Sequence, residues 1–263
     1  MKKFIYILLL FIGVNSYAQK PVLEFKENKG QWNKKVLYKA QIPGGNLYLE
    51  NNRLTYQFYN ENDLLRLDDV HHGFISNPTH QDSIISLHAF QVNFVNALTP
   101  SLSAQKPRPD YENYFVSSKP KQWASNVKKY ETVNYQEIYD GIDLKFYLKG
   151  SHLKYDFIVA SNGNPHEIKM KYEGVDMLYL NNGNLQIKTS VNEISEQKPY
   201  AYQIINGVEK EVKCKFVLNG NTLSFSFPRG YKKSEPLIID PVLIFASYSG
   251  STVDNWGYTS TFN

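Results

Sequence analysis

Apolar and polar residues alternate with a period of two along much of this chain, the pattern of β-strands with one buried face. The clearest example covers residues 142–159, where two alternating runs flank Gly150-Ser151. A two-residue turn with glycine first favours a type II′ hairpin. A slip of one residue would move every apolar side chain to the other face, so the register is well specified. The predicted pairs are Ile142 with Val159, Leu144 with Phe157, Phe146 with Tyr155 and Leu148 with Leu153 on the apolar face, and Lys145 with Asp156 on the outer face.

Two more hairpins are predicted from the same alternation. Residues 212–227 contain Asn219-Gly220, a dipeptide typical of type I′ turns. Residues 47–59 are expected to turn at Asn51-Asn52. The predicted pairs in the first are Val212 with Phe227, Cys214 with Phe225 and Phe216 with Leu223, and the inward residues of the second are Leu54, Tyr56 and Phe58.

The remaining pattern predicts short strands separated by turns, and no window shows a sustained helical period with an N-cap. This combination indicates an all-β protein, which we expect to form two β-sandwich-like lobes of antiparallel hairpins. Prolines interrupt the pattern between residues 99 and 110, so the lobes are predicted as residues 19–110 and 111–240, with 117–126 as the alternative boundary. The other predicted strands are 84–95, 177–180, 185–189, 200–205 and 237–245.

Residues 1–18 have the three-part pattern of a secretory signal peptide. Lys2 and Lys3 precede an apolar run, and Ser16-Tyr17-Ala18 places small residues where a signal peptidase reads them. The apolar run is 11 residues long, whereas a membrane-spanning helix needs about 20. We therefore expect cleavage after Ala18 and a chain that is secreted, extracellular or on the outer cell surface. An uncleaved anchor is the alternative.

Composition narrows the classes of partner and cofactor. The chain has 263 residues, of which 42% are hydrophobic, enough for one or two packed domains. Removing two leader lysines from the 29 basic residues leaves 27 against 25 acidic residues. This small basic excess gives no reason to expect nucleic acid as a partner. A single cysteine excludes a disulfide framework and a multi-cysteine metal site.

No motif in the sequence indicates catalysis, and we expect neither an enzyme nor a cofactor. Cys214 is predicted on an apolar face, as a core residue rather than a nucleophile. Four histidines between residues 71 and 88 lack zinc-site spacing, so no metal is expected. Asp140 and Asp143 occupy turn and outer-strand positions. A glycoside hydrolase would need two carboxylates about 5–10 Å apart in one cleft, and it is the less favoured alternative.

Aromatic residues offer the most specific hypothesis about a ligand. The chain has 20 tyrosines, 15 phenylalanines and 3 tryptophans. Exposed tryptophan or tyrosine rings on a flat sheet can stack on sugar rings, because they present a large apolar face beside a polar group. Packing in the core or at a sheet edge is the alternative for each residue. The candidate ligand contacts are Trp32, Trp123, Tyr59 and Tyr147.

Several strings, taken together, resemble the N-terminal region of large secreted surface proteins of Bacteroidota. They are Phe25-Lys26-Glu27-Asn28-Lys29-Gly30-Gln31-Trp32, Val36-Leu37-Tyr38-Lys39-Ala40, Pro43-Gly44-Gly45-Asn46-Leu47, Leu54-Thr55-Tyr56, Tyr139-Asp140-Gly141-Ile142-Asp143-Leu144, Tyr155-Asp156-Phe157-Ile158-Val159 and Ile239-Asp240-Pro241. Tyr248-Ser249-Gly250-Ser251 and Asp254-Asn255-Trp256-Gly257 are similar to the start of the β-propeller-type (SBBP) repeats that follow in those proteins. The resemblance covers essentially the whole mature chain.

The resemblance implies an uncharacterised β-rich module that opens a modular protein. Residues 241–263 would then be the incomplete start of a propeller-type repeat. Proteins of this kind commonly continue into further domains and a C-terminal sorting domain of the gliding-motility-associated, type IX secretion kind. Because the sequence ends inside the first repeat-like segment, we expect either a truncated reading frame or a module that works alone. The resemblance implies no catalytic residues.

These observations together predict a non-catalytic, secreted or cell-surface module with a structural or adhesion-type function. Its expected partner is a following repeat domain or an extracellular surface ligand, including a glycan. Nucleic acid is not expected as a partner, and no transmembrane segment is expected after signal cleavage. The alternative is a carbohydrate-binding module that uses exposed aromatic residues.

Overall fold

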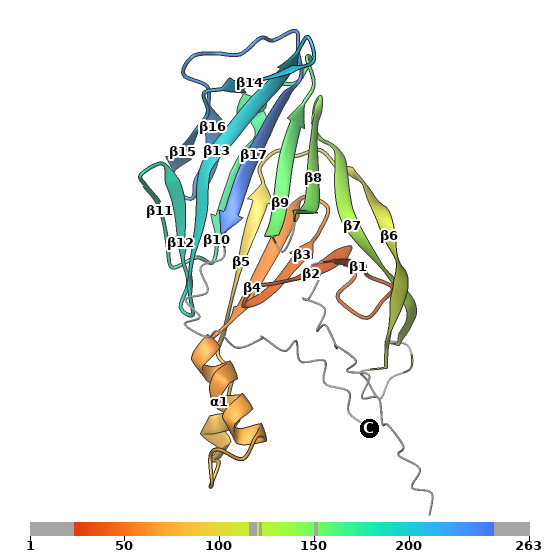
Figure 1. The fold of residues 1–263 in the computed structure, drawn as a ribbon, viewed down its shortest axis with the longest axis vertical. Helices are drawn as coiled ribbons and strands as arrows, with labels where there is room; N and C mark the ends of the chain where they lie inside the picture. The colour runs from red at the N-terminus through yellow and green to blue at the C-terminus, as the bar shows by residue number, and fades with distance from the viewer. Residues whose placement is uncertain (1–23, 116–119, 121–122, 150–151, 245–263) are drawn as a thin grey trace, which may run out of the picture.

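The computed structural model describes residues 24–115, 120, 123–149 and 152–244, and within them the chain is built mostly of antiparallel strands (Figure 1). Seventeen strands of this described part belong to one hydrogen-bonded sheet, which confirms the all-β class. The strands are β1 (Phe25–Glu27), β2 (Tyr38–Ile42), β3 (Gly45–Leu49), β4 (Arg53–Tyr59), β5 (Leu87–Phe94), β6 (Ser101–Tyr114), β7 (Ala124–Tyr139), β8 (Ile142–Lys149), β9 (His152–Val159), β10 (Met170–Glu173), β11 (Met177–Asn181), β12 (Asn184–Lys188), β13 (Glu193–Ile205), β14 (Val208–Val212), β15 (Lys215–Asn219), β16 (Thr222–Ser226) and β17 (Leu237–Ile244). The helices are α1 (Glu61–His71) and the short 3-10 helices η1 (His80–Ser83) and η3 (Pro165–Glu167).

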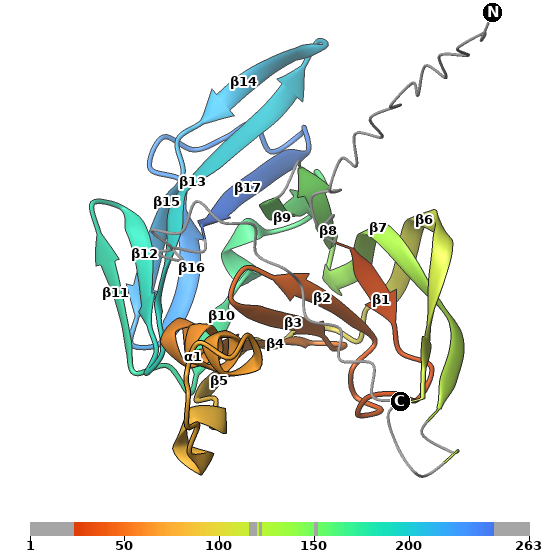
Figure 2. The same cartoon turned by 60° about the horizontal axis from the view of Figure 1, so that its bottom comes forward.

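The sheet divides into two arms at β7. One side of β7 pairs with β6, while its other side pairs with β1 near the start of the strand and with β8 near its end. From β1, one arm continues through β2, β3, β4, β5, β10 and β16 to β15. From β8, the other arm continues through β9, β17, β13 and β12 to β11, and β14 also pairs with β13. Figure 2 shows the two arms from below.

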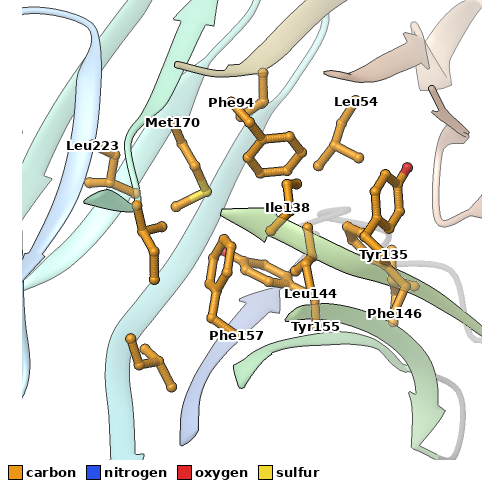
Figure 3. Packing of buried hydrophobic residues seen from close by; sticks show 14 of the residues in the cluster. Leu54, Phe94, Tyr135, Ile138, Leu144, Phe146, Tyr155, Phe157, Met170 and Leu223 are labelled. Atoms are coloured by element: carbon orange, nitrogen blue, oxygen red, sulfur yellow. The ribbon is translucent and has the colours of Figure 1, made fainter. Parts of the chain in front are cut away.

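The two arms share one hydrophobic core (Figure 3). The ring of Phe157 on β9 lies 6.4 Å from that of Phe94 on β5 and 5.9 Å from that of Phe225 on β16. These rings come from both predicted lobes, 19–110 and 111–240, and β5 also pairs directly with β10. Burial of such large apolar surfaces is the main favourable term in folding, so the two halves stabilise one another.

The predicted lobe boundary lies within a long edge strand. Pro107 and Pro109 belong to β6, which pairs on one side with β7. Proline lacks a backbone N–H, and it is tolerated in a strand whose outer edge has no partner. The ladder shifts register between Pro107 and Tyr111, so the prolines interrupt the hydrogen bonding without ending the strand.

Two of the three predicted hairpins have the predicted register. On β8 and β9, Leu144 is opposite Phe157 and Lys145 is opposite Asp156. The predicted turn residues 150–151 lie outside the described part of the chain. On β3 and β4, Leu49 is opposite Leu54, and the backbone N–H of Glu50 donates to the carbonyl of Arg53 across 3.0 Å.

The register predicted for the hairpin in residues 212–227 is wrong by two residues. Phe216 lies opposite Phe225, and Asn219 lies opposite Thr222, so the central turn residues are Gly220 and Asn221. Gly220 has a φ of 55°, whereas Asn219 has no positive φ. A type I′ turn at Asn219-Gly220 would need positive φ at both positions. A shift of two residues preserves the faces of a strand, so Cys214, Phe216, Leu223 and Phe225 remain buried. Val212 is also buried, but it lies on β14 opposite Ala201, and Phe227 is half-buried beyond the end of β16.

The prediction that no helix is present is wrong for α1. The helix begins after Asn60, whose side-chain oxygen accepts a hydrogen bond from the backbone N–H of Asp63 across 3.2 Å. Glu61 and Asp63 add negative charge to the first turn, where the helix dipole favours it. None of the residues of α1 is buried, and this explains why its sequence carries no strong apolar stripe.

Candidate functional site

The outer sides of β2, β3 and β4 bring aromatic rings, amides and an ammonium group together on one surface of the described chain. Side chains alternate along a strand, so Lys39, Tyr48 and Gln57 point to the outer face of the sheet. Their neighbours in the chain, Ala40, Leu47 and Phe58, are buried on the inner face. Figure 2 shows these strands between α1 and β1. We call the surface the aromatic face and define it as Trp32, Lys39, Asn46, Tyr48, Gln57, Tyr59 and Tyr114.

Trp32 at one end of the aromatic face is held by a loop that has its own hydrogen-bond network. The side chain of Asn28 accepts from the backbone N–H of Trp32 across 3.2 Å and donates to the carbonyl of Val36 across 2.7 Å. The Trp32 ring packs edge-on against Tyr114, with a centroid separation of 5.5 Å. The ring is therefore positioned before any ligand arrives, which lowers the entropy cost of binding.

Lys39 occupies the middle of the face, between two aromatic rings. Its Nζ lies 5.5 Å from the ring centroid of Trp32 and 5.5 Å from that of Tyr48. Both separations are within the range of cation–π attraction. Burial, together with the nearby Lys26 ammonium, lowers the pKa of Lys39 from its ordinary value, while the Glu112 carboxylate acts in the opposite direction.

The other end of the face is a network of hydroxyl and amide groups. The Tyr48 hydroxyl donates to Oε1 of Gln57 across 3.0 Å. Nδ2 of Asn46 donates to the Tyr59 hydroxyl across 3.2 Å, and that hydroxyl is 3.5 Å from Oε1 of Gln57. The structure therefore brings Trp32 and Tyr59, two predicted contact residues, onto one surface with both stacking rings and hydrogen-bonding groups.

The other two predicted contact residues lie elsewhere. Trp123 is 45% exposed just before β7 and packs edge-on against Phe115, with a centroid separation of 5.4 Å. Tyr147 lies on the outer side of β8, where its hydroxyl donates to Oδ1 of Asp156 across 3.2 Å. Lys39, Tyr48 and Tyr114 were not among the predicted contact residues, although the alternation in residues 38–49 places the first two on the outer side of the sheet.

Carboxylates gather around Tyr147. Burial, with the neighbouring Asp240 carboxylate, raises the pKa of Asp156 to about 6. Nζ of Lys154 lies 2.8 Å from Oδ1 of Asp240 and neutralises it. Acid–base chemistry can use two carboxylates with separated pKa values, but this pair lies on the outer faces of β9 and β17.

The carboxylates considered for hydrolysis in the sequence have separate surroundings. Asp140 is exposed in the turn between β7 and β8. Asp143 accepts a hydrogen bond from the backbone N–H of Glu137 across 2.8 Å. Glu137 has a φ of 53° at an irregular point of the β7–β8 ladder. The Asp143 side chain therefore satisfies a backbone donor that the ladder leaves over.

One more carboxyl group, that of Glu196, lies inside the core. Glu196 on β13 is 2% exposed, and the Tyr155 hydroxyl donates to its Oε1. The Tyr172 hydroxyl is 3.5 Å from its Oε2. The cavity beside these groups measures about 10 Å³, which is at the lower limit for one water molecule. It has no room for a ligand.

Metal-ligating side chains do not converge in the described part of the chain, where no group of three or more His, Cys, Asp or Glu residues is placed to hold an ion. The ring of His88 has two partners, the Ser190 hydroxyl at 2.9 Å and the Gly174 carbonyl at 2.6 Å. His72 caps the C-terminus of α1, with its Nε2 3.3 Å from Asp68. Within the same described residues, no helix has the length and apolar character to cross a membrane.

Comparison with known proteins gives one match. Residues 25–242 match the model of a family described as a domain of unknown function, DUF7948. No curated protein and no solved structure matches the chain. The matched region begins at β1 and ends within β17.

Proposed function

We propose an adhesion-type role for this chain, which belongs to the DUF7948 family. In this proposal it is a non-catalytic module of a secreted or cell-surface protein, and it makes a structural or adhesive contact through the aromatic face. The signal-peptide pattern of residues 1–18 supports export. The sheet supports a rigid platform, because both of its arms share one core.

The aromatic face is the observation that carries the proposal. Trp32 comes from the β1–β2 loop, Tyr114 from β6, and Lys39, Tyr48 and Tyr59 from three adjacent strands. Strands of the sheet hold four of these five side chains, and a functional site on such rigid elements is more precise than one on loops. The rings and the Gln57 amide are half-buried and keep part of their surface exposed, whereas Asn46 is buried beneath them.

A glycan is one of two candidate partners for the aromatic face. Aromatic rings provide flat apolar area for the faces of sugar rings, and neighbouring amides and hydroxyls hydrogen-bond to sugar hydroxyls. Tyr48, Gln57 and Tyr59 provide both kinds of group within one hydrogen-bonded network. A following repeat domain of the same protein is the other partner that we propose.

The test is binding of the mature chain to immobilised extracellular polysaccharides and to cell surfaces. We expect Trp32→Ala combined with Tyr48→Ala to abolish binding. Trp123→Ala is the matched control, because it removes an exposed tryptophan outside the face. Unchanged binding by the double variant, or loss of binding in the control alone, would contradict the proposal.

A further inference from the structure

We propose that the aromatic face selects an acidic polysaccharide, and that the Lys39 ammonium pairs with the carboxylate of a uronic acid residue. The inference rests on the proposed function, since it names the ligand class of the same face. It goes further because it assigns a charge requirement to one side chain.

The first observation is the ion pairing of the cations around the face. Lys26 lies 2.7 Å from Glu112, Lys29 lies 3.4 Å from Glu27, and Arg53 pairs with Glu50. Each of these positive charges is therefore neutralised within the protein. Lys39 differs, because no carboxylate of the described residues lies within 4.0 Å of its ammonium group, although the Glu112 carboxylate, held by Lys26, is near enough to act on its charge.

The second observation is the position of this unpaired charge. The Lys39 ammonium lies over the rings of both Trp32 and Tyr48, 5.5 Å from each ring centroid, so the charge is placed between two rings of the aromatic face. A half-buried cation is incompletely hydrated, and a carboxylate from a ligand would replace the water that it has lost. Sugar stacking and charge pairing would then occur at one point on the face.

The charge of the surrounding surface favours a ligand with few negative charges. Glu24, Glu27 and Glu112 lie beside the Trp32 end of the face and already engage the nearby lysines. A densely sulfated chain would meet these carboxylates and be repelled. A polymer with one carboxylate on each sugar ring can place one carboxylate at Lys39 and others near Lys34 and Lys35, which are exposed on the Trp32 loop.

The experiment compares two forms of one polymer, so that only the charge differs. The mature chain is titrated with polygalacturonate and with the same polymer after full methyl esterification, and binding is followed by calorimetry. We expect at least tenfold tighter binding of the acid form, falling with added salt because the pairing is electrostatic. Alginate is expected to bind as well, since it also carries one carboxylate on each ring.

Variants of Lys39 test the assignment of the charge. Lys39→Met keeps the length of the side chain and should remove the preference for the acid form, while Lys39→Arg should retain it. Circular dichroism of each variant shows that the fold is intact, and the rescue by arginine excludes a loss caused by packing alone. Equal binding of acid and ester forms, a preference that survives in Lys39→Met, or tighter binding of dextran sulfate would each overturn the inference.

The outcomes also separate this inference from the proposed function. Binding to neutral glycans that depends on Trp32 and Tyr48, without any preference for acid forms, would overturn the inference and leave the proposed function standing. A chain that binds no polysaccharide and no cell surface would overturn both.

Discussion

Tyr155 donates a hydrogen bond from its hydroxyl to the carboxyl group of Glu196 at the centre of the core, between the two arms of the sheet. Burial raises the pKa of Glu196 to about 7, although the hydroxyls of Tyr155 and Tyr172 act in the opposite direction. A carboxyl group in water titrates near 4.3, so folding changes the proton affinity of this side chain.

This shift predicts that Glu196 makes the protein less stable as the pH rises. Below about pH 4.3 the group is protonated in both the folded and unfolded states and costs nothing. Between that pH and about 7, the unfolded chain releases its proton while the folded chain retains it, so the free energy of unfolding falls. Above about 7 the loss is complete.

The substitution Glu196→Gln isolates this contribution. Glutamine keeps the shape without the charge, so we expect the variant to be more stable than the wild type at pH 8, with a smaller difference at pH 5. Urea unfolding at several pH values measures both. Glu193→Gln, an exposed position on the same strand, is the control. The prediction fails if both variants keep the full pH dependence of the wild type.

Gly45 is expected to tolerate no side chain. A Cβ atom there would lie 1.9 Å from the carbonyl oxygen of Gln57 and 3.0 Å from Cα of Phe58, both in the backbone of β4. Because the backbone would have to move, Gly45→Ala should cost about 2–4 kcal/mol of unfolding free energy.

Gly207→Ala provides the comparison for this substitution. Gly207 has a φ of 78° but nothing within 4 Å of a built Cβ, so alanine there should cost only about 1 kcal/mol. Thermal or urea unfolding of both variants gives the difference. Equal costs would show that the contact with β4 relaxes easily.

Cys214 should react slowly with thiol reagents in the native protein. Its side chain is buried just before β15, and burial raises the pKa of the thiol to about 12. The reactive thiolate is therefore scarce at neutral pH as well as inaccessible. We expect labelling by a disulfide reagent to be at least tenfold slower in buffer than in urea. Labelling at the same rate in both would contradict the burial.

The N-cap of α1 should matter locally rather than globally. Asn60→Ala removes the acceptor of the Asp63 backbone N–H and should destabilise the helix by about 1 kcal/mol, whereas Asn60→Asp should preserve the cap. Since α1 buries no residue, the effect should appear as faster hydrogen exchange within Glu61–His71. A similar loss in the global unfolding midpoint would mean that the helix is coupled to the core.

Prediction from the sequence succeeded where a short-range rule determined the structure. The β8–β9 register followed from two signals, because alternation decided which side chains share a face and the two-residue connection decided which of them are opposite. On β15 and β16 the same rule identified the buried face but not the register, since pairings two residues apart bury the same side chains. The helix α1 was missed because it packs against no core.

The sequence by itself determined the all-β class and the inward and outward faces of most strands. Tertiary structure alone decided that both halves share one core, that Trp32 and Tyr59 lie on one face, and that Glu196 is buried beside Tyr155. The physical reason is the range of the forces involved. Alternation and turn preferences act between near neighbours in the chain, whereas these relationships depend on strands that pair and pack across long sequence separations.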